Sequence, residues 1–437
     1  MTDTGRRLSH AALPPRPDRY PTVAQAVAAA RGLAQLHPGR CRVREVGRSR
    51  AGRPLVLVSV GDGPGGVLVV GGPHPNEPVG PASALRITGE LLRRPVPPGG
   101  AGVPWHILLC LDPDGAALNE GWLDGPLTLR RHYEHFYRPA YEEQPEFLPS
   151  AGSGRAPMPE SVVLTGLIDE LRPFLQCSLH GVDFGGAFVQ LTRPVPGLAE
   201  RFARSVARAG IPLDVDAYDA AGWDSPAPGT YVLPEPGRDG LPQALPDDPA
   251  LSTWSYAGRY GGVTAVLEVP MWAVEAVGDT RPHPEVARTV GTAARSLRDR
   301  AQELTTLLGH VPAHARAAYG PLVRTAEFNL GVCPQLADEW LARWCPRPLS
   351  ASRVAAVGIA AERIPLRVAS MLLRLLADTD GPAVAAARRR AERIVAESSD
   401  RLRHRFGARW VPVDTQITHQ TRAVFAAAEC LAPGRRP

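Results

Sequence analysis

Four short, mainly apolar runs constrain the fold of this chain more than any other feature of its sequence. They occupy residues 67–70, 106–111, 174–179 and 263–269 and are rich in Val and Leu. Runs of this length are typical of strands that are buried on both faces of a sheet. Helical patterns separate them, and this alternation predicts an α/β fold: a three-layer α/β/α sandwich around a mixed, mostly parallel central sheet.

A helix and a β-hairpin are predicted before the first buried run. Thr22 can cap a helix through Gln35, in which Val and Ala recur at helical spacing. Residues 41–46 alternate between apolar and polar side chains, and residues 55–60 are again rich in Val and Leu. With the RAGR turn between them, these two segments predict a hairpin.

Two long stretches, 112–159 and 218–250, lack clear helix or strand patterns. Unpatterned loops of this length are usually functional. From about residue 285 the chain instead carries long helical patterns rich in Ala, Leu and Arg, at 285–308, 363–377, 382–406 and 415–430.

We therefore place a domain boundary near His310. Three parts are predicted: a flexible segment at 1–20, a catalytic domain at 21–309 and an all-helical C-terminal domain at 310–437. The helical domain is expected to pack beside the catalytic domain, where it either restricts the pocket or forms a homodimer contact.

Charge and composition exclude several classes of protein. The net charge of +5 is concentrated between Arg388 and Arg409, where eight arginines accompany three acidic residues, and no nucleic-acid reading motif goes with them. The six cysteines lie far apart without a CxxC pair, so neither a disulfide scaffold nor a thiolate zinc site is expected. No apolar run is long enough to span a membrane. A cytoplasmic protein without nucleic-acid or membrane partners is predicted.

The segment VLVVGGPHPNEPVG places His74 and Glu77 just beyond the end of a buried strand, with two residues between them. Both side chains can then converge on one ion, and catalytic zinc favours three protein ligands drawn from imidazole nitrogens and carboxylate oxygens. His180, in QCSLHG at the end of another apolar run, is the candidate third ligand. Because functional groups gather outside the carboxyl ends of strands in α/β sheets, these distant segments can meet. The sequence predicts one Zn²⁺ per chain at this site.

Glu268 lies in a further strand, TAVLEVP, where a carboxylate would be costly to bury without a partner or a function. Its alternative role is a buried ion pair with one of the many arginines. The HYEH segment offers a rival metal site, with His132 and His135 three residues apart and Glu134 between them. No buried strand presents these side chains, so a place in a substrate loop or on the surface is favoured for them.

Several segments, in the same order, resemble the M14 family of zinc carboxypeptidases. VGRSRAGRPLVLVSVG is similar to the hairpin that opens those domains, and LDPDGAALNEGW to the family's NPDG segment with Asp112 in place of Asn. STWSYAGRYGGVTAVLEVP looks like the strand that carries the family's catalytic glutamate. The resemblance covers residues 47–272, roughly half of the chain. It implies that Glu268 is the general base and that the three residues proposed above are the zinc ligands.

The resemblance also implies residues that hold the substrate and the reacting oxyanion. The family uses arginines after its NPDG segment, and Arg130 and Arg131 are the candidates for stabilising the oxyanion. The family's second Asn-Arg pair looks replaced by Tyr137 and Arg138. Arg138 is expected to bind the terminal carboxylate of the substrate, because a guanidinium group suits bidentate binding. Further substrate-binding residues are expected to be tyrosines: Tyr137, and either Tyr231 or Tyr256 in place of the tyrosine that closes over the substrate.

The activity implied is that of a zinc-dependent hydrolase that removes the C-terminal residue from a peptide or an amino-acid conjugate. Zinc lowers the pKa of bound water to about 7, and Glu268 would accept the water proton and deliver it to the leaving amine. Two alternatives stay open. One is a desuccinylase-like amidase or deacylase acting on an N-acyl amino acid or a small metabolite, and the other is a non-catalytic binding protein with the same fold.

Overall fold

The computed structural model describes residues 18–95, 102–150, 152–235, 251–377 and 379–432. Most of the segment expected to be flexible, 1–20, lies outside these ranges, as does part of the stretch 218–250. Within the first described residues, Tyr20 is buried and its hydroxyl donates a hydrogen bond to Oε1 of Gln416 at 2.7 Å. The chain is therefore already fixed to the fold at Tyr20.

A ten-stranded mixed sheet forms the centre of the described molecule, in the order β1-β2-β4-β3-β5-β9-β6-β8-β7, with β10 paired to β9. Pairing is parallel among β4, β3, β5 and β9 and between β6 and β8, and antiparallel elsewhere. The mixed sheet is thus confirmed, with its main parallel part at the centre. The strands are β1 (Cys41–Arg48), β2 (Pro54–Val60), β3 (Val67–Val70), β4 (Trp105–Leu108), β5 (Leu175–Gly185), β6 (Phe188–Leu191), β7 (Asp224–Ala227), β8 (Thr230–Val232), β9 (Val263–Ala273) and β10 (Arg409–Trp410).

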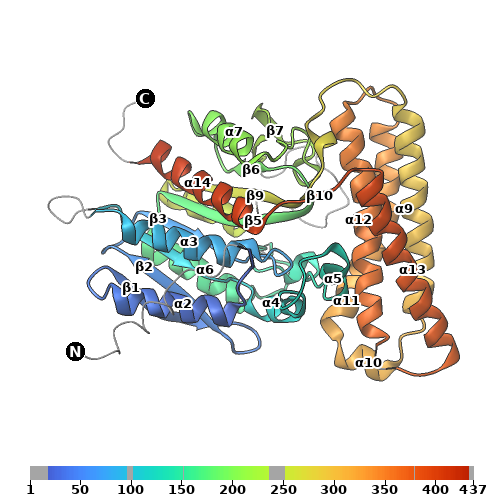
Figure 1. The fold of residues 1–437 in the computed structure, drawn as a ribbon, viewed down its shortest axis with the longest axis horizontal. Helices are drawn as coiled ribbons and strands as arrows, with labels where there is room; N and C mark the ends of the chain where they lie inside the picture. The colour runs from blue at the N-terminus through green and yellow to red at the C-terminus, as the bar shows by residue number, and fades with distance from the viewer. Residues whose placement is uncertain (1–17, 96–101, 151, 236–250, 378, 433–437) are drawn as a thin grey trace.

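Helices cover both faces of the sheet, because alternate side chains of each central strand point to opposite sides. In β3, Val67 and Val69 belong to one apolar cluster, whereas Leu68 and Val70 belong to another. The first cluster lies under four helices, of which α3 and α14 are seen beside the sheet in Figure 1: α2 (Val23–Leu36), α3 (Val79–Arg93), α7 (Leu198–Ala209) and α14 (Val413–Leu431). The second lies under α6 (Pro159–Leu171) and α8 (Thr253–Tyr256). The predicted three-layer sandwich is confirmed.

The stretch 112–159, expected to be a loop, contains two short helices, α4 (Pro113–Asn119) and α5 (Leu129–Glu134). Each begins at a side chain that accepts a hydrogen bond from the first turn: Asp112 from the Gly115 amide and Thr128 from the Arg131 amide. Helices of six or seven residues show no periodicity that a sequence pattern can reveal. Short 3₁₀ segments also lie at η1 (Glu120–Trp122), η2 (Tyr141–Glu143), η3 (Tyr218–Ala220), η4 (Ala257–Tyr260) and η5 (Glu275–Gly278).

A bundle of long helices stands at one end of the sheet, on the right in Figure 1. Its central helix, α12, packs against α9, α11 and α13. The helical character predicted for this part of the chain is confirmed, but the part is not all-helical as predicted, because β10 at Arg409–Trp410 pairs with β9. The members are α9 (Val286–Leu308), α10 (Ala313–Ala318), α11 (Gly320–Glu339), the π-helical segment η6 (Trp340–Trp344), α12 (Ala351–Leu375) and α13 (Pro382–His404).

The helices do not divide between sheet and bundle at His310. α9, which precedes that residue, packs in the bundle against α11 and α12. α14, the last helix, packs instead on the sheet side against α3, α7 and β9. How the chain divides into independently folding domains stays a prediction, but these contacts show that 310–437 does not pack as one helical unit.

Two further properties of the described residues bear on the predictions. No disulfide bond joins the cysteines of the described residues. None of the helices in the described ranges combines the length and the apolar character that crossing a membrane requires.

Candidate metal centre

The register of two central strands brings His180 and Glu268 together. β5 and β9 pair in parallel with His180 opposite Glu268, so their side chains are neighbours in the sheet. Both strands continue past the expected ends at 179 and 269, so His180 lies inside its strand rather than after it, while Glu268 lies inside its strand as predicted. In β5 backbone pairing continues through the polar residues His180 and Asp183, and in β9 it continues past Pro270.

The turn after β3 carries His74 and Glu77. The last residue of β3, Val70, pairs with Ser178 of β5, two residues before His180, so the turn starts close to that side chain. A hydrogen bond from the Glu77 amide to the His74 carbonyl at 3.1 Å closes the turn. Gly72 has a φ of +53°, and a Cβ there would lie 2.9 Å from the Cys110 sulfur. A glycine at this position therefore lets the chain turn tightly between β3 and α3.

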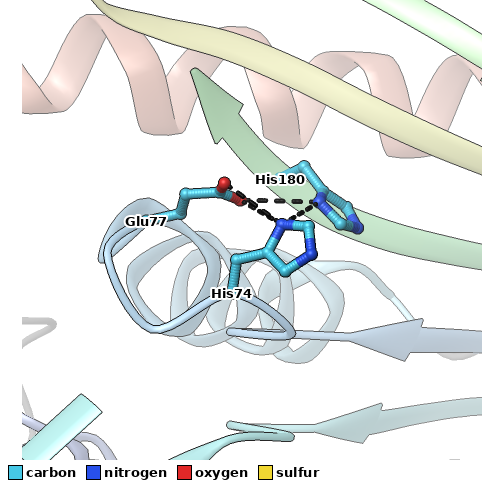
Figure 2. Close-up of side chains that lie close together, drawn as sticks. All are labelled: His74, Glu77 and His180. Carbon is cyan, nitrogen blue, oxygen red and sulfur yellow. Dashed lines mark hydrogen bonds and ion pairs between the residues drawn. The ribbon is translucent and has the colours of Figure 1, made fainter. Parts of the chain in front are cut away.

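The three predicted zinc ligands converge, as Figure 2 shows. The Nδ1 atoms of His74 and His180 lie 3.0 Å apart, and Glu77 Oε1 is 3.1 Å from His74 Nδ1. Glu77 Oε2 is 3.4 Å from His180 Nδ1. Ligand atoms around a tetrahedral zinc with bonds of about 2.0–2.1 Å are roughly 3.3 Å apart. These side chains therefore fit a zinc ion both in chemical type and in spacing.

Metal ligands must be deprotonated, and the electrostatics favour that state for two of the three groups. The exception is His180, whose pKa is held, in spite of burial, well above its usual value by the carboxylates of Glu146, Glu77 and Glu268, so zinc would have to displace a proton from this ring. Burial, reinforced by the Arg138 guanidinium, lowers the pKa of His74 to about 4, so its ring is neutral at physiological pH. Burial alone would raise the pKa of Glu77, but the neighbouring imidazoles and Arg138 hold it well below its usual value. Glu77 is therefore a carboxylate and His74 a neutral imidazole.

Glu146 is a functional candidate that the sequence did not reveal. It is buried, and its Oε2 lies 2.9 Å from Nε2 of His180, on the side of the ring away from the other two ligands. Its Oε1 accepts a hydrogen bond from the Ser178 hydroxyl at 2.5 Å. Carboxylates that bind the second nitrogen of a ligand histidine fix the orientation and tautomer of its ring. Glu146 follows a proline in an irregular stretch, and no motif marked it.

Glu268 is buried beside the three ligands. Its Oε1 lies 3.7 Å from Nδ1 of His180, while its Oε2 has no hydrogen-bond partner. Burial raises the pKa of Glu268 to about 8. The nearby His180 ring opposes this shift, and the negative charge of Glu77 adds to it. The alternative of a buried ion pair with an arginine is not observed among the described residues, because the charged group in contact with Glu268 is the His180 ring.

Of the three predicted arginines, the structure brings only Arg138 to the site. Its Nη1 donates to Glu77 Oε1 at 2.7 Å, and its Nη2 lies 3.1 Å from His74 Nδ1. Arg130 is exposed and pairs with Glu134 one helical turn away. Arg131 donates to the Gly121 carbonyl. Both lie on α5, a helix that the sequence did not predict, and neither lines the cavity around the metal ligands.

The predicted tyrosines also lie away from the ligands. Tyr137 is buried in the apolar core, and its backbone is held by Asn119. The Tyr256 hydroxyl donates to Asp169 on α6, and Tyr231 donates to the Asp214 carbonyl. None of the three lines the cavity, so other side chains must contact the substrate there.

The rival site at HYEH is not formed. His132 is buried among aromatic rings, including those of Trp122 and Trp272, and burial lowers its pKa to about 4. Within the described ranges, the one group of three or more His, Cys, Asp or Glu side chains close enough to hold a metal ion is His74, Glu77 and His180.

A cavity of about 260 Å³ opens beside the metal ligands. The sheet contributes the ligands and Glu268 to its wall, and the bundle contributes Phe328 of α11 and Arg363 and Arg367 of α12. The bundle therefore does restrict the pocket, which is one of the two roles predicted for it. No sequence pattern indicated which helical residues would reach the site.

One known family matches part of this chain. The sequence model of the zinc carboxypeptidase family, Peptidase_M14, matches residues 26–134, a range that includes His74 and Glu77. The match confirms the resemblance seen in the sequence and the assignment to hydrolases. No curated protein sequence matches the chain.

Three solved structures are among those with similarity to this chain. Carboxypeptidase A from Helicoverpa armigera is 17% identical over 62% of this chain and 71% of its own, with a TM-score of 0.38. A metallo-carboxypeptidase from Burkholderia cenocepacia is 20% identical over 57% and 60%, with a TM-score of 0.34. Bovine thrombin-activatable fibrinolysis inhibitor is 11% identical over 57% and 86%, with a TM-score of 0.35. Identities and scores this low do not extend the family assignment beyond residues 26–134.

Proposed function

We propose that this chain, whose residues 26–134 match the zinc carboxypeptidases, is a zinc-dependent hydrolase that cleaves the C-terminal amide bond of a peptide or an amino-acid conjugate. The observation that supports this most is the convergence of two imidazoles and a carboxylate beside a cavity that Glu268 also lines. When bound there, zinc would supply a Lewis acid and a water of lowered pKa. His74, Glu77 and His180 would hold it.

Glu268 is assigned the role of general base. Its Oε2 has no hydrogen-bond partner, so this oxygen is free to accept the proton of the attacking water and to return it to the leaving amine. Its raised pKa lies close to neutrality, where a carboxyl group both takes up and releases protons.

Arg138 is assigned to the oxyanion that forms on the scissile carbonyl. Its guanidinium lies directly against two of the ligand side chains, whereas Arg130 and Arg131 lie on α5 and do not line the cavity. A fixed positive charge beside the reacting carbonyl stabilises negative charge as it develops, without further reorganisation. This assignment replaces the carboxylate-binding role expected for Arg138 from the sequence.

A deacylase of N-acyl amino acids is the second candidate. The volume of the cavity, about 260 Å³, favours a substrate with a small acyl group over one whose acyl side is a long peptide. Both activities would use the same metal, base and oxyanion arginine, and they differ in what lies on the acyl side of the bond. N-acetyl dipeptides and N-acyl amino acids, compared at equal concentration with the zinc-loaded protein, would separate the two.

Glu268→Gln tests the enzymatic assignment. The variant should bind one zinc per chain like the parent, while kcat falls by about 10²- to 10⁴-fold because the base is removed. Unchanged turnover in the variant would remove Glu268 from the reaction. A zinc-loaded parent that hydrolyses no N-acetyl dipeptide and no N-acyl amino acid would refute the proposed activity and favour a binding protein.

A further inference from the structure

Part of the cavity wall is supplied by α12 of the helical bundle. Arg363 and Arg367 line the cavity together with the metal-binding side chains. They are four residues apart, so both lie on one face of this helix. The bundle therefore brings two guanidinium groups to a cavity whose other wall already holds a metal site and a general base.

The two arginines differ in what they bind within the protein. Arg367 donates from Nε and Nη2 to the same oxygen of the buried Asp183 carboxylate, at 2.9 and 2.7 Å. Arg363 is equally deep, with 8% of its surface exposed, but its Nε has no hydrogen-bond partner. Its acidic neighbour is Asp219, whose nearer oxygen lies 3.5 Å from Nη2 and whose side chain is 48% exposed.

Of the three cavity arginines, Arg363 is thus the one whose charge is least satisfied. Arg138 is held by Glu77 and His74, and Arg367 by Asp183. At 3.5 Å the contact with Asp219 is longer than a normal hydrogen bond, and water competes for the half-exposed Asp219 carboxylate, so this pair satisfies the Arg363 guanidinium only in part. A buried donor without a partner is costly, and a ligand that supplies the missing acceptor relieves this cost.

We propose that Arg363 binds the free carboxylate of the substrate, so that the helical bundle selects compounds that end in an unblocked carboxylate. The inference rests on the proposed hydrolase function and names the substrate class of the same site. A carboxylate matches the planar fork of a guanidinium group, and because Arg363 is buried such a charge-assisted bond is stronger there than at the surface. Arg363 is a binding residue in this proposal and takes no part in bond cleavage.

Binding to the zinc-loaded Glu268→Gln protein tests the proposal without relying on turnover. The probes are N-acetyl dipeptides with a free C-terminal carboxylate and the same dipeptides as carboxamides, measured by calorimetry. We expect the free acids to bind at least about 10-fold more tightly than the carboxamides. Adding Arg363→Met should remove this preference, and Arg363→Lys, which keeps the charge but not the fork, should retain part of it.

Arg374→Met is the matched control. This arginine lies on the same helix and donates to backbone carbonyls of His135 and Phe136, but it does not line the cavity. It should leave the preference for free acids unchanged. Zinc content, measured for every variant, would reveal a collapsed site.

The outcomes separate this inference from the proposed function. If the parent hydrolyses the dipeptides but Arg363→Met keeps the full preference for free acids, the inference is wrong and the hydrolase assignment stands. If Arg138→Met loses the preference while Arg363→Met does not, the anchor is Arg138. Equal binding of acids and carboxamides to the Glu268→Gln protein would overturn the inference as well. Absence of turnover in the parent would instead contradict the proposed function.

Discussion

Removal of Arg367 should destabilise the protein by more than removal of any exposed ion pair does, because it takes away the arginine that contacts the buried Asp183 carboxylate. Asp183 is fully buried on β5, three residues after His180, and accepts from Arg367 at 2.7 and 2.9 Å. The Tyr133 hydroxyl and the Asn76 amide also donate to it, at 3.0 and 3.2 Å. Breaking a buried pair from one side costs about 3–5 kcal/mol.

The pKa of Asp183 gives an independent magnitude. Burial would raise it, but Arg367 and other nearby positive charges lower it from 3.8 to about 2, which corresponds to about 2 kcal/mol of folding free energy. Because the folded-state pKa is the lower one, this stabilisation is complete above about pH 4 and is lost as the pH falls through about 2. In the Arg367→Met variant, the folded protein no longer favours the ionised form of the Asp183 carboxyl group. The difference in stability between parent and variant should therefore shrink toward about pH 3.

Urea unfolding of Arg367→Met and the parent, near neutral pH and near pH 3, measures both effects. The double variant Asp183→Asn/Arg367→Met should recover part of the loss, since no uncompensated charge is then buried. Arg388→Met is the control, because its pair with Glu392 is exposed and should contribute no more than about 1 kcal/mol. The reasoning would be refuted if Arg367→Met lost no more free energy of unfolding than the Arg388→Met control, or if its loss were the same near pH 3 as near neutral pH.

Two further changes test how the metal centre is supported. Glu146→Gln should weaken zinc binding by about 10- to 100-fold in chelator competition, because the His180 imidazole loses its charged partner. The control is Glu142→Gln, which lies on the same stretch but outside the cavity and should leave the zinc affinity unchanged. Equal zinc affinities of the two variants would contradict the supporting role of Glu146. Gly72→Ala should lower the free energy of unfolding by about 1–2 kcal/mol and reduce zinc content, because the φ of this residue is positive and its Cβ would meet the Cys110 sulfur. The control is Gly166→Ala in α6, where a Cβ meets no atom within 4 Å, and it should not lower the free energy of unfolding. A Gly72→Ala protein as stable as the parent would contradict this prediction.

The sequence was informative where local pattern decides the structure. The run Val67–Val70 became β3 because four apolar residues in a row satisfy both faces of a sheet, and Thr22 caps α2 through the predicted hydrogen bond. His74 and Glu77 could be placed together because the turn that holds them is only a few residues long. The end of an apolar run was a poor guide to the end of a strand, as β5 and β9 show.

Contacts between distant segments could not be read from spacing. Arg363 reaches the cavity because α12 packs beside the sheet, and nothing in its helical pattern distinguishes it from arginines on other faces. Glu146 became visible only when its 2.9 Å approach to His180 was known. Arg130 and Arg131 were chosen by their order after the NPDG-like segment, but the short helix α5 turns them away from the ligands.

The pairing of Arg409 on β10 with Ala273 at the end of β9 has a consequence for how this chain is built. The polypeptide leaves the sheet and returns to it at the same point, so residues 274–408 form one closed excursion between two adjacent backbone positions. Because the two ends of this excursion meet, its length places no constraint on the strand order or on the position of α14. The excursion is nevertheless tied to the sheet through Arg367 of α12, whose ion pair with Asp183 of β5 lies three residues from His180. One helix therefore carries both the proposed anchor for the substrate and a support for the strand of a metal ligand, so specificity and stability should change together when this helix is altered.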